Sequence, residues 1–151
     1  MEKETEQELI KRMIGFQKEE ITSSIIYQKL AAKEKNPHNR EILQRIAEDE
    51  RRHYATLRGY THQDVSPNRF EICFYVWLVR LLGVTFAVRR LELGEKETSG
   101  VYSQYPSMEH FAEMARDEQH HEEKLIEMID EERLQYMGSV VLGLNLSLIH
   151  I

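Results

Sequence analysis

The sequence predicts an all-α fold: a four-helix bundle made of a duplicated helical hairpin, with an extra apolar helix between its second and third helices. Apolar residues recur at alternating spacings of three and four over long segments, which is the period of one helix face. Only three prolines and seven glycines interrupt the 151 residues, so the uninterrupted segments are long. The length is typical of one domain, which we expect over residues 1–137.

Composition restricts the function classes. The net charge of -6 argues against a nucleic-acid partner. The single cysteine, Cys73, excludes a disulfide framework and a Cys-x-x-Cys site, and it fits a reducing compartment. Because Cys73 lies in an apolar run, we expect it to be a small core residue. The charged first residues have no apolar segment behind them, so we expect no signal peptide and a cytoplasmic location.

The first two predicted helices each carry an acidic residue in their apolar stripe. The first helix runs from about Glu4 to Lys33; the second begins with Asn36 as N-cap and Pro37 in the first turn, and closes near Gly59. A buried position is therefore expected for several polar side chains. The first stripe comprises Leu9, Met13, Phe16, Glu20, Ser23, Tyr27 and Leu30, and the second comprises Leu43, Ile46, Glu50, His53 and Leu57.

The extra helix follows a polar loop from Gly59 to Asn68. Its apolar stretch, Ile72 to Leu82, is too short and too charged for a membrane span, which needs ~20 apolar residues. We predict a buried or subunit-interface helix, and from it a homodimer with helices exchanged across the preceding loop. A membrane-surface role for the aromatic residues Phe74, Tyr75 and Trp77 is the alternative.

The second half repeats the arrangement. A third bundle helix is expected from Val84 to Tyr102, a break at Tyr105-Pro106-Ser107, and a fourth helix from about Met108 to Met137. Residues 138–151 lose the charged face and read as the truncated start of a membrane segment or as a vector-derived tail. The fourth stripe comprises Phe111, Met114, Glu118, His121, Leu125 and Met128.

Both halves thus have the same polar pattern in the predicted core. Glu20 precedes Tyr27 by seven residues and Glu95 precedes Tyr102 by seven, while Glu50-x-x-His53 and Glu118-x-x-His121 follow in turn. Burying a charge costs several kcal/mol unless it is compensated, and a metal cation is the usual compensation for a Glu-x-x-His pair inside a bundle. Carboxylates with two imidazoles suit a pair of iron or manganese ions and are too oxygen-rich for a closed structural zinc site.

This pattern resembles the ferritin-like di-iron carboxylate proteins, and the segment Glu20–Tyr27 with the Glu92/Glu95 pair is similar to the rubrerythrin branch, although the four-cysteine iron site is missing. The runs Phe86–Glu95 and Val141–Asn145 are similar to the N-terminal ferritin-like domain of membrane-bound ferritins of the vacuolar-iron-transporter type. The resemblance implies a ferritin-like bundle with two iron ions. It implies the ligands Glu20, Glu50, His53, Glu95, Glu118 and His121, an exchangeable extra ligand in Glu92, and hydrogen bonds from Tyr27 and Tyr102 to carboxylates.

Several functions are compatible with these residues. The leading hypothesis is Fe(II) oxidation by O2 or hydrogen peroxide in the iron-handling domain of a membrane iron transporter, at the cytoplasmic face. A rubrerythrin-like peroxidase with a separate electron donor, a non-catalytic iron-binding or sensing module, and a structural bundle with Arg-paired carboxylates are the alternatives. The ligand types leave iron versus manganese and O2 versus peroxide open, and we expect no catalytic residues beyond the metal ligands.

Overall fold

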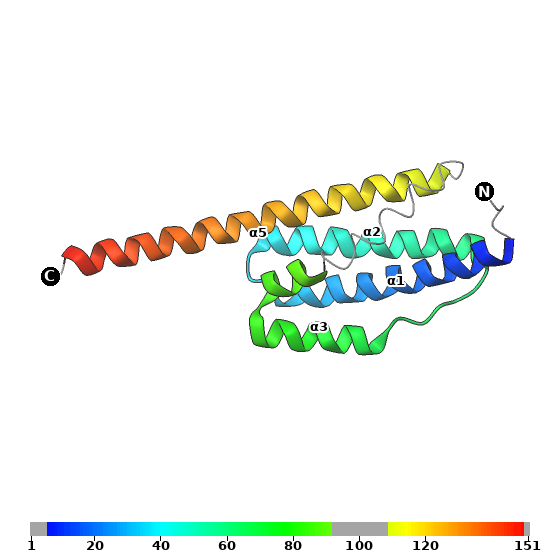
Figure 1. Cartoon of the computed structure of the whole chain (residues 1–151), viewed down its shortest axis with the longest axis horizontal. Helices are drawn as coiled ribbons and strands as arrows, with labels where there is room; N and C mark the ends of the chain where they lie inside the picture. The colour runs from blue at the N-terminus through cyan, green and yellow to red at the C-terminus, as the bar shows by residue number, and fades with distance from the viewer. Residues whose placement is uncertain (1–5, 92–108, 150–151) are drawn as a thin grey trace.

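A computed structural model describes residues 6–91 and 109–149, and all regular secondary structure in these ranges is helical. The helices are α1 (Glu6–Lys33), α2 (Pro37–Thr61), α3 (Arg69–Leu82) and α5 (Glu109–Ile149), and residues 84–91 are helical as well. Helix α2 lies between α1 and α5, while α3 packs on α1 (Figure 1). The all-α prediction is confirmed, including the extra helix between α2 and residues 84–91.

The first hairpin closes with the predicted cap. The Asn36 side chain accepts hydrogen bonds from the backbone N–H groups of His38 and Asn39, at 2.9 and 3.3 Å, and Pro37 opens α2. The end of α2 differs from the expectation at Gly59. The helix continues to Thr61, whose hydroxyl donates to Gln17 Oε1 at 2.7 Å, because this buried contact with α1 keeps the last turn in place.

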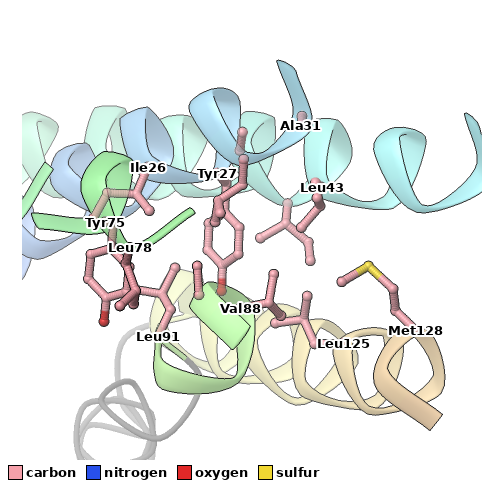
Figure 2. Packing of buried hydrophobic residues seen from close by; sticks show 14 residues of the cluster. Ile26, Tyr27, Ala31, Leu43, Tyr75, Leu78, Val88, Leu91, Leu125 and Met128 are labelled. Atoms are coloured by element: carbon pink, nitrogen blue, oxygen red, sulfur yellow. The ribbon is translucent and has the colours of Figure 1, made fainter. Parts of the chain in front are cut away.

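Two apolar clusters flank a polar layer in the bundle. The larger cluster includes Tyr27, Leu43 and Leu125 (Figure 2), and the smaller one contains Met13, Leu57, Phe111 and Met114. Along α1, α2 and α5 the predicted metal ligands lie between members of the two clusters, as Glu20 does between Met13 and Tyr27. The fold therefore places these carboxylates and imidazoles between two water-excluding layers.

Helix α3 is amphipathic rather than buried all round. Its fully buried side chains are Tyr75 and Leu78, whereas Phe70 is 89% exposed and Trp77 57% exposed. The expectation that Cys73 is a core residue is wrong, since the thiol is exposed. Only one stripe of α3 faces α1. Residues two positions apart on an α-helix are separated by about 200°, so Cys73 points away when Tyr75 points inward. The subunit interface proposed for the apolar face stays a prediction.

Helix α5 is longer than predicted. It continues through Gly138 to Ile149 instead of ending near Met137, and its last part extends beyond the other helices (Figure 1). Neither a proline nor a left-handed glycine interrupts it there, so nothing local ends the helix. Among the described helices, none has the length and apolarity needed to cross a membrane. Glu92, Glu95, Tyr102 and the predicted break at Tyr105–Ser107 lie outside the described residues.

Candidate metal centre

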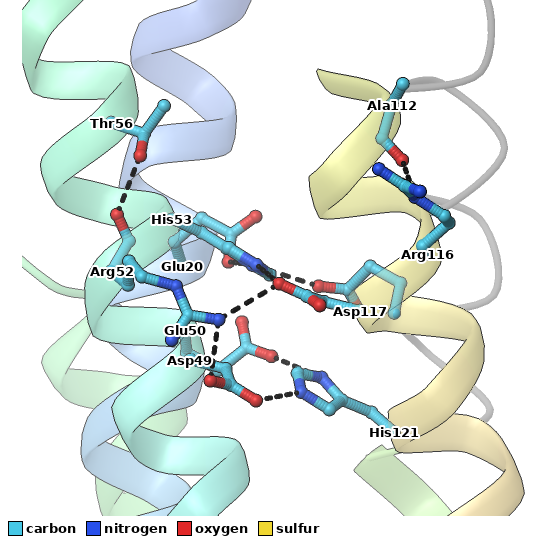
Figure 3. A network of polar contacts seen from close by, with 11 residues as sticks. Glu20, Asp49, Glu50, Arg52, His53, Thr56, Ala112, Arg116, Asp117 and His121 are labelled. Atoms are coloured by element: carbon cyan, nitrogen blue, oxygen red, sulfur yellow. Dashed lines mark hydrogen bonds and ion pairs between the residues drawn. The ribbon is translucent and has the colours of Figure 1, made fainter. Parts of the chain in front are cut away.

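Side chains from three helices converge in the polar layer. Figure 3 shows Glu20 on α1 close to Glu50 and His53 on α2. Together with Glu118 on α5, each of these residues offers one ligand atom, and these atoms all lie within 4.8 Å of one another. Glu20, Glu50 and His53 are buried, and the Glu118 side chain is 11% exposed. Residues far apart in the sequence thus form one compact group of carboxylates around an imidazole.

His121 completes the other end of this group. Its Nδ1 lies 3.2 Å from Glu50 Oε1, and its ring centroid lies 6.2 Å from that of His53. The structure therefore brings together five of the predicted ligands, Glu20, Glu50, His53, Glu118 and His121. The sixth, Glu95, and the extra ligand Glu92 lie outside the described residues, so their part in the site stays a prediction.

The inward-facing atoms of the histidines lie close to carboxylate oxygens. His53 Nδ1 lies 3.4 Å from Glu20 Oε2 and 3.3 Å from Glu118 Oε1. The Nδ1 atoms of His53 and His121 and Oε1 of Glu118 are buried without a hydrogen bond. Buried polar atoms normally have hydrogen-bond partners, so a group of nitrogen and oxygen atoms buried without them fits coordination to a metal ion once the imidazoles are neutral. Oxygen-rich ligation with imidazole nitrogen suits iron or manganese.

The outer nitrogen of each histidine contacts an aspartate of the other Glu-x-x-His helix. His53 Nε2 lies 3.1 Å from Asp117 Oδ2, and His121 Nε2 lies 2.9 Å from Asp49 Oδ2. An Nε2–H donating to the carboxylate leaves the Nδ1 lone pair directed into the site, which orients the ring for metal binding. Our sequence analysis missed both aspartates, although each motif reads Asp-Glu-x-x-His and the repeated Asp was the available signal.

One arginine links the two aspartates across the outside of the site. Arg52 Nη2 lies 2.8 Å from Asp49 Oδ1 and 3.1 Å from Asp117 Oδ2, as Figure 3 shows. Burial alone would raise the pKa of Asp117, but its contacts with His53 and Arg52 lower that pKa below the ordinary value. Asp117 therefore remains an ionised hydrogen-bond acceptor for His53. Arg52 ties α2 to α5 at the level of the predicted ligands.

The environment of His53 is strongly negative. Burial lowers the pKa of His53, but the carboxylates of Glu118 and Glu20, with Asp117 behind the ring, outweigh burial and raise this pKa to about 10. A proton on His53 offsets part of the carboxylate charge when no cation is bound. A metal ion needs the neutral imidazole, so its binding releases that proton.

Tyr27 was predicted to donate a hydrogen bond to a carboxylate. The structure buries Tyr27 completely in the larger apolar cluster, beside Leu43 and Val88 (Figure 2). The position suits the packing role of an amphipathic aromatic residue. Its predicted support of a ligand, and that of Tyr102, which lies outside the described residues, stay predictions.

Asp49→Asn and Asp117→Asn are each expected to weaken metal binding about 10–100-fold, because an amide no longer holds the histidine in the required orientation. Isothermal titration with Mn(II) measures the change. Asp64→Asn is the control, since Asp64 is 75% exposed and pairs with Arg58 away from the site. Equal affinity in all four proteins would show that the aspartates do not orient the ligands.

The helical bundle with a buried group of carboxylates and histidines has the architecture of ferritin-like proteins and a candidate metal site of the kind that they contain. Residues 1–60, which include Glu20, Glu50 and His53, match the rubrerythrin family model. No curated protein and no solved structure shows significant similarity to the chain. The runs Phe86–Glu95 and Val141–Asn145, on which the predicted relationship to membrane-bound ferritins rests, lie outside the matched residues, so that relationship stays a prediction.

Proposed function

We propose that the chain binds two iron ions between α1, α2 and α5 and that the loaded protein oxidises Fe(II) with O2 or hydrogen peroxide. The observation that carries the proposal is the set of buried atoms at His53 Nδ1, His121 Nδ1 and Glu118 Oε1, which face the carboxylates without hydrogen bonds. Iron bound there supplies the redox chemistry by changing between Fe(II) and Fe(III). The protein supplies the ligands, their orientation and a water-excluding surround.

The distribution of ligands supports two metal positions. His53 faces Glu20 and Glu118, whereas His121 faces Glu50. Glu50 also belongs to the compact group around His53, so its carboxylate is placed to contact ions at both ends. With the predicted Glu95, four carboxylates would offset the charge of two divalent cations. This balance favours a dinuclear centre over a single ion.

The surroundings of the site support a reactive centre rather than a surface cation site. The two apolar clusters cover the polar layer on both sides along the bundle. Exclusion of water strengthens the attraction between carboxylates and cations, and it protects bound ions from side reactions. Asp49 keeps His121 in place, and Asp117 keeps His53 in place, while the charge of the metals changes.

A rubrerythrin-like peroxidase is the second candidate, and the family match of residues 1–60 favours it. The chain has a single cysteine, so it cannot form a four-cysteine iron site of its own and would need a separate electron donor. A non-catalytic iron sensor uses the same ligands. We further propose that the chain is the iron-handling domain of a membrane iron transporter, on the basis of the similarity of Val141–Asn145 to membrane-bound ferritins.

Anaerobic titration of the metal-free protein with Fe(II), followed by O2 or peroxide in separate stopped-flow runs, tests the proposal. We expect saturation at two irons per chain, then oxidation, and loss of both in Glu50→Ala and Glu118→Ala. Glu48→Ala, at an exposed position of α2, is the matched control. Rapid oxidation without a reductant favours the first function, whereas peroxide turnover that requires a reductant favours the second.

Tight uptake without oxidation would leave the sensor as the remaining function. No uptake, or uptake that Glu50→Ala and Glu118→Ala do not change, would overturn the metal centre itself. Full stability after chelation would then indicate a structural bundle.

A further inference from the structure

A cavity of about 470 Å³ lies between α2 and α5, directly beside the proposed metal centre. Its lining includes Asp49 and His121, which already belong to the centre. His121 is buried and its Nδ1 has no hydrogen bond, whereas the Asp49 side chain is 27% exposed. The cavity therefore reaches from solvent to Asp49 and the outer side of His121, next to the proposed metal centre.

The outer part of the cavity carries further metal-binding types of side chain. His38 and Glu41 on α2 and His120 on α5 line it, and all three are exposed. Imidazole nitrogen and carboxylate oxygen are donors for first-row divalent cations. Among the described residues, the closely spaced group with ligand atoms within 4.8 Å is the one at the centre. The looser arrangement at the mouth suits brief contact with a cation rather than storage.

The two repeats differ at this point. In the first motif Arg52 occupies the position before the histidine, and its guanidinium bonds both Asp49 and Asp117. In the second motif the same position is His120, which lines the cavity instead. A guanidinium carries a permanent positive charge that repels cations, whereas a neutral imidazole can bind them. The first motif thus has a guanidinium at this position, whereas the second has an imidazole in the cavity, whose lining also includes Lys124 and Arg45, the latter paired with Glu41.

We propose that this cavity is the route by which divalent metal ions reach the centre. His120 is the first contact for the ion, and Asp49 is the carboxylate next to His121 at which the ion leaves the route for the centre. This route rests on the proposed metal binding, and it adds the side of the bundle from which the metal ions enter the centre. It predicts that residues at the mouth control how fast a metal binds and leave the stoichiometry unchanged.

Substitution of Lys124 should change the association rate in the direction opposite to substitution of His120. The Lys124 ammonium group lines the same cavity and pairs with Glu127 at 2.9 Å. Charges that line a cleft change the local concentration of an ionic ligand, and with it the association rate. Removal of this positive charge should speed the arrival of a divalent cation, whereas removal of the His120 imidazole should slow it.

Stopped-flow absorbance of Co(II) binding to the metal-free full chain measures both effects. We expect the association rate to fall about threefold to tenfold in His120→Ala, because the first ligand for the ion is lost, and to rise about twofold or more in Lys124→Gln, because a repelling charge is lost. The dissociation constant stays unchanged, so the dissociation rate moves in parallel. His110→Ala is the control, because His110 lies on the same helix beside Tyr60, outside the cavity.

Equal association rates in all variants, with normal Co(II) stoichiometry, would overturn the route and leave the metal centre intact. A weaker equilibrium affinity of His120→Ala with an unchanged association rate would also overturn it, since His120 would then act at the centre. Failure of the unmodified chain to bind Co(II) or Fe(II) would instead overturn the proposed function.

Discussion

Metal loading is expected to raise the thermal unfolding midpoint by roughly 8–16 °C at a metal concentration a thousand times the dissociation constant. This linkage is worth about 4 kcal/mol, and a domain of this size shifts by about 2–4 °C per kcal/mol. The physical reason is the buried group of Glu20, Glu50 and Glu118, whose carboxylates repel one another without a cation. Calorimetry of the metal-free protein with and without Mn(II) measures the shift.

Glu118→Ala provides the control for this stabilisation. The variant lacks one of the grouped ligands, so most of the metal-dependent shift should disappear from it. Its metal-free form should unfold at a similar temperature to the metal-free parent, because the variant loses one repelling carboxylate but also loses a partner of His53. An identical shift in parent and variant would place the stabilising metal elsewhere on the chain.

Leu43→Ala is expected to lower the free energy of unfolding by about 2–5 kcal/mol, the usual cost of emptying a buried leucine position. Leu43 is fully buried in the larger apolar cluster, where α1, α2 and α5 meet (Figure 2). Urea denaturation followed by circular dichroism measures the loss. We expect metal stoichiometry to be retained, because Leu43 lies about two turns from Glu50 on α2.

Leu134→Ala is the matched control for Leu43→Ala, since Leu134 lies on α5 and is 70% exposed. Its unfolding free energy should change by less than about 0.5 kcal/mol. Similar losses in the two variants would mean that the exposed part of α5 is covered in solution. Such a result would indicate a subunit contact on α5, which differs from the contact predicted for the apolar segment Ile72 to Leu82.

The ligand helices and their caps could be predicted because their signals are local. A spacing of three and four places Glu20, Glu50 and Glu118 among apolar neighbours on one face, and the chain gives this face directly. Asn36 and Pro37 likewise act within a single turn. Three helices that bury these faces together must bring the carboxylates into one layer, as the structure shows.

The two wrong predictions concern features that depend on which other helices lie nearby. Cys73 was expected inside, but α3 packs against α1 along one stripe and leaves the thiol outside. Helix α5 was expected to end near Met137, yet it continues to Ile149 beyond the other helices. An apolar run shows that burial is favourable, but it does not show which neighbour is present to cover it.

By itself the sequence determined the all-α class, the faces that meet in the core, and the Glu and His residues placed on those faces. Only the tertiary structure decided that Asp49 contacts His121, that Asp117 contacts His53, and that Arg52 contacts both aspartates. It also decided that a cavity opens beside His120. Helical periodicity assigns each side chain to a face of its own helix, whereas pairing between helices depends on their packing, which brings together residues more than 60 positions apart.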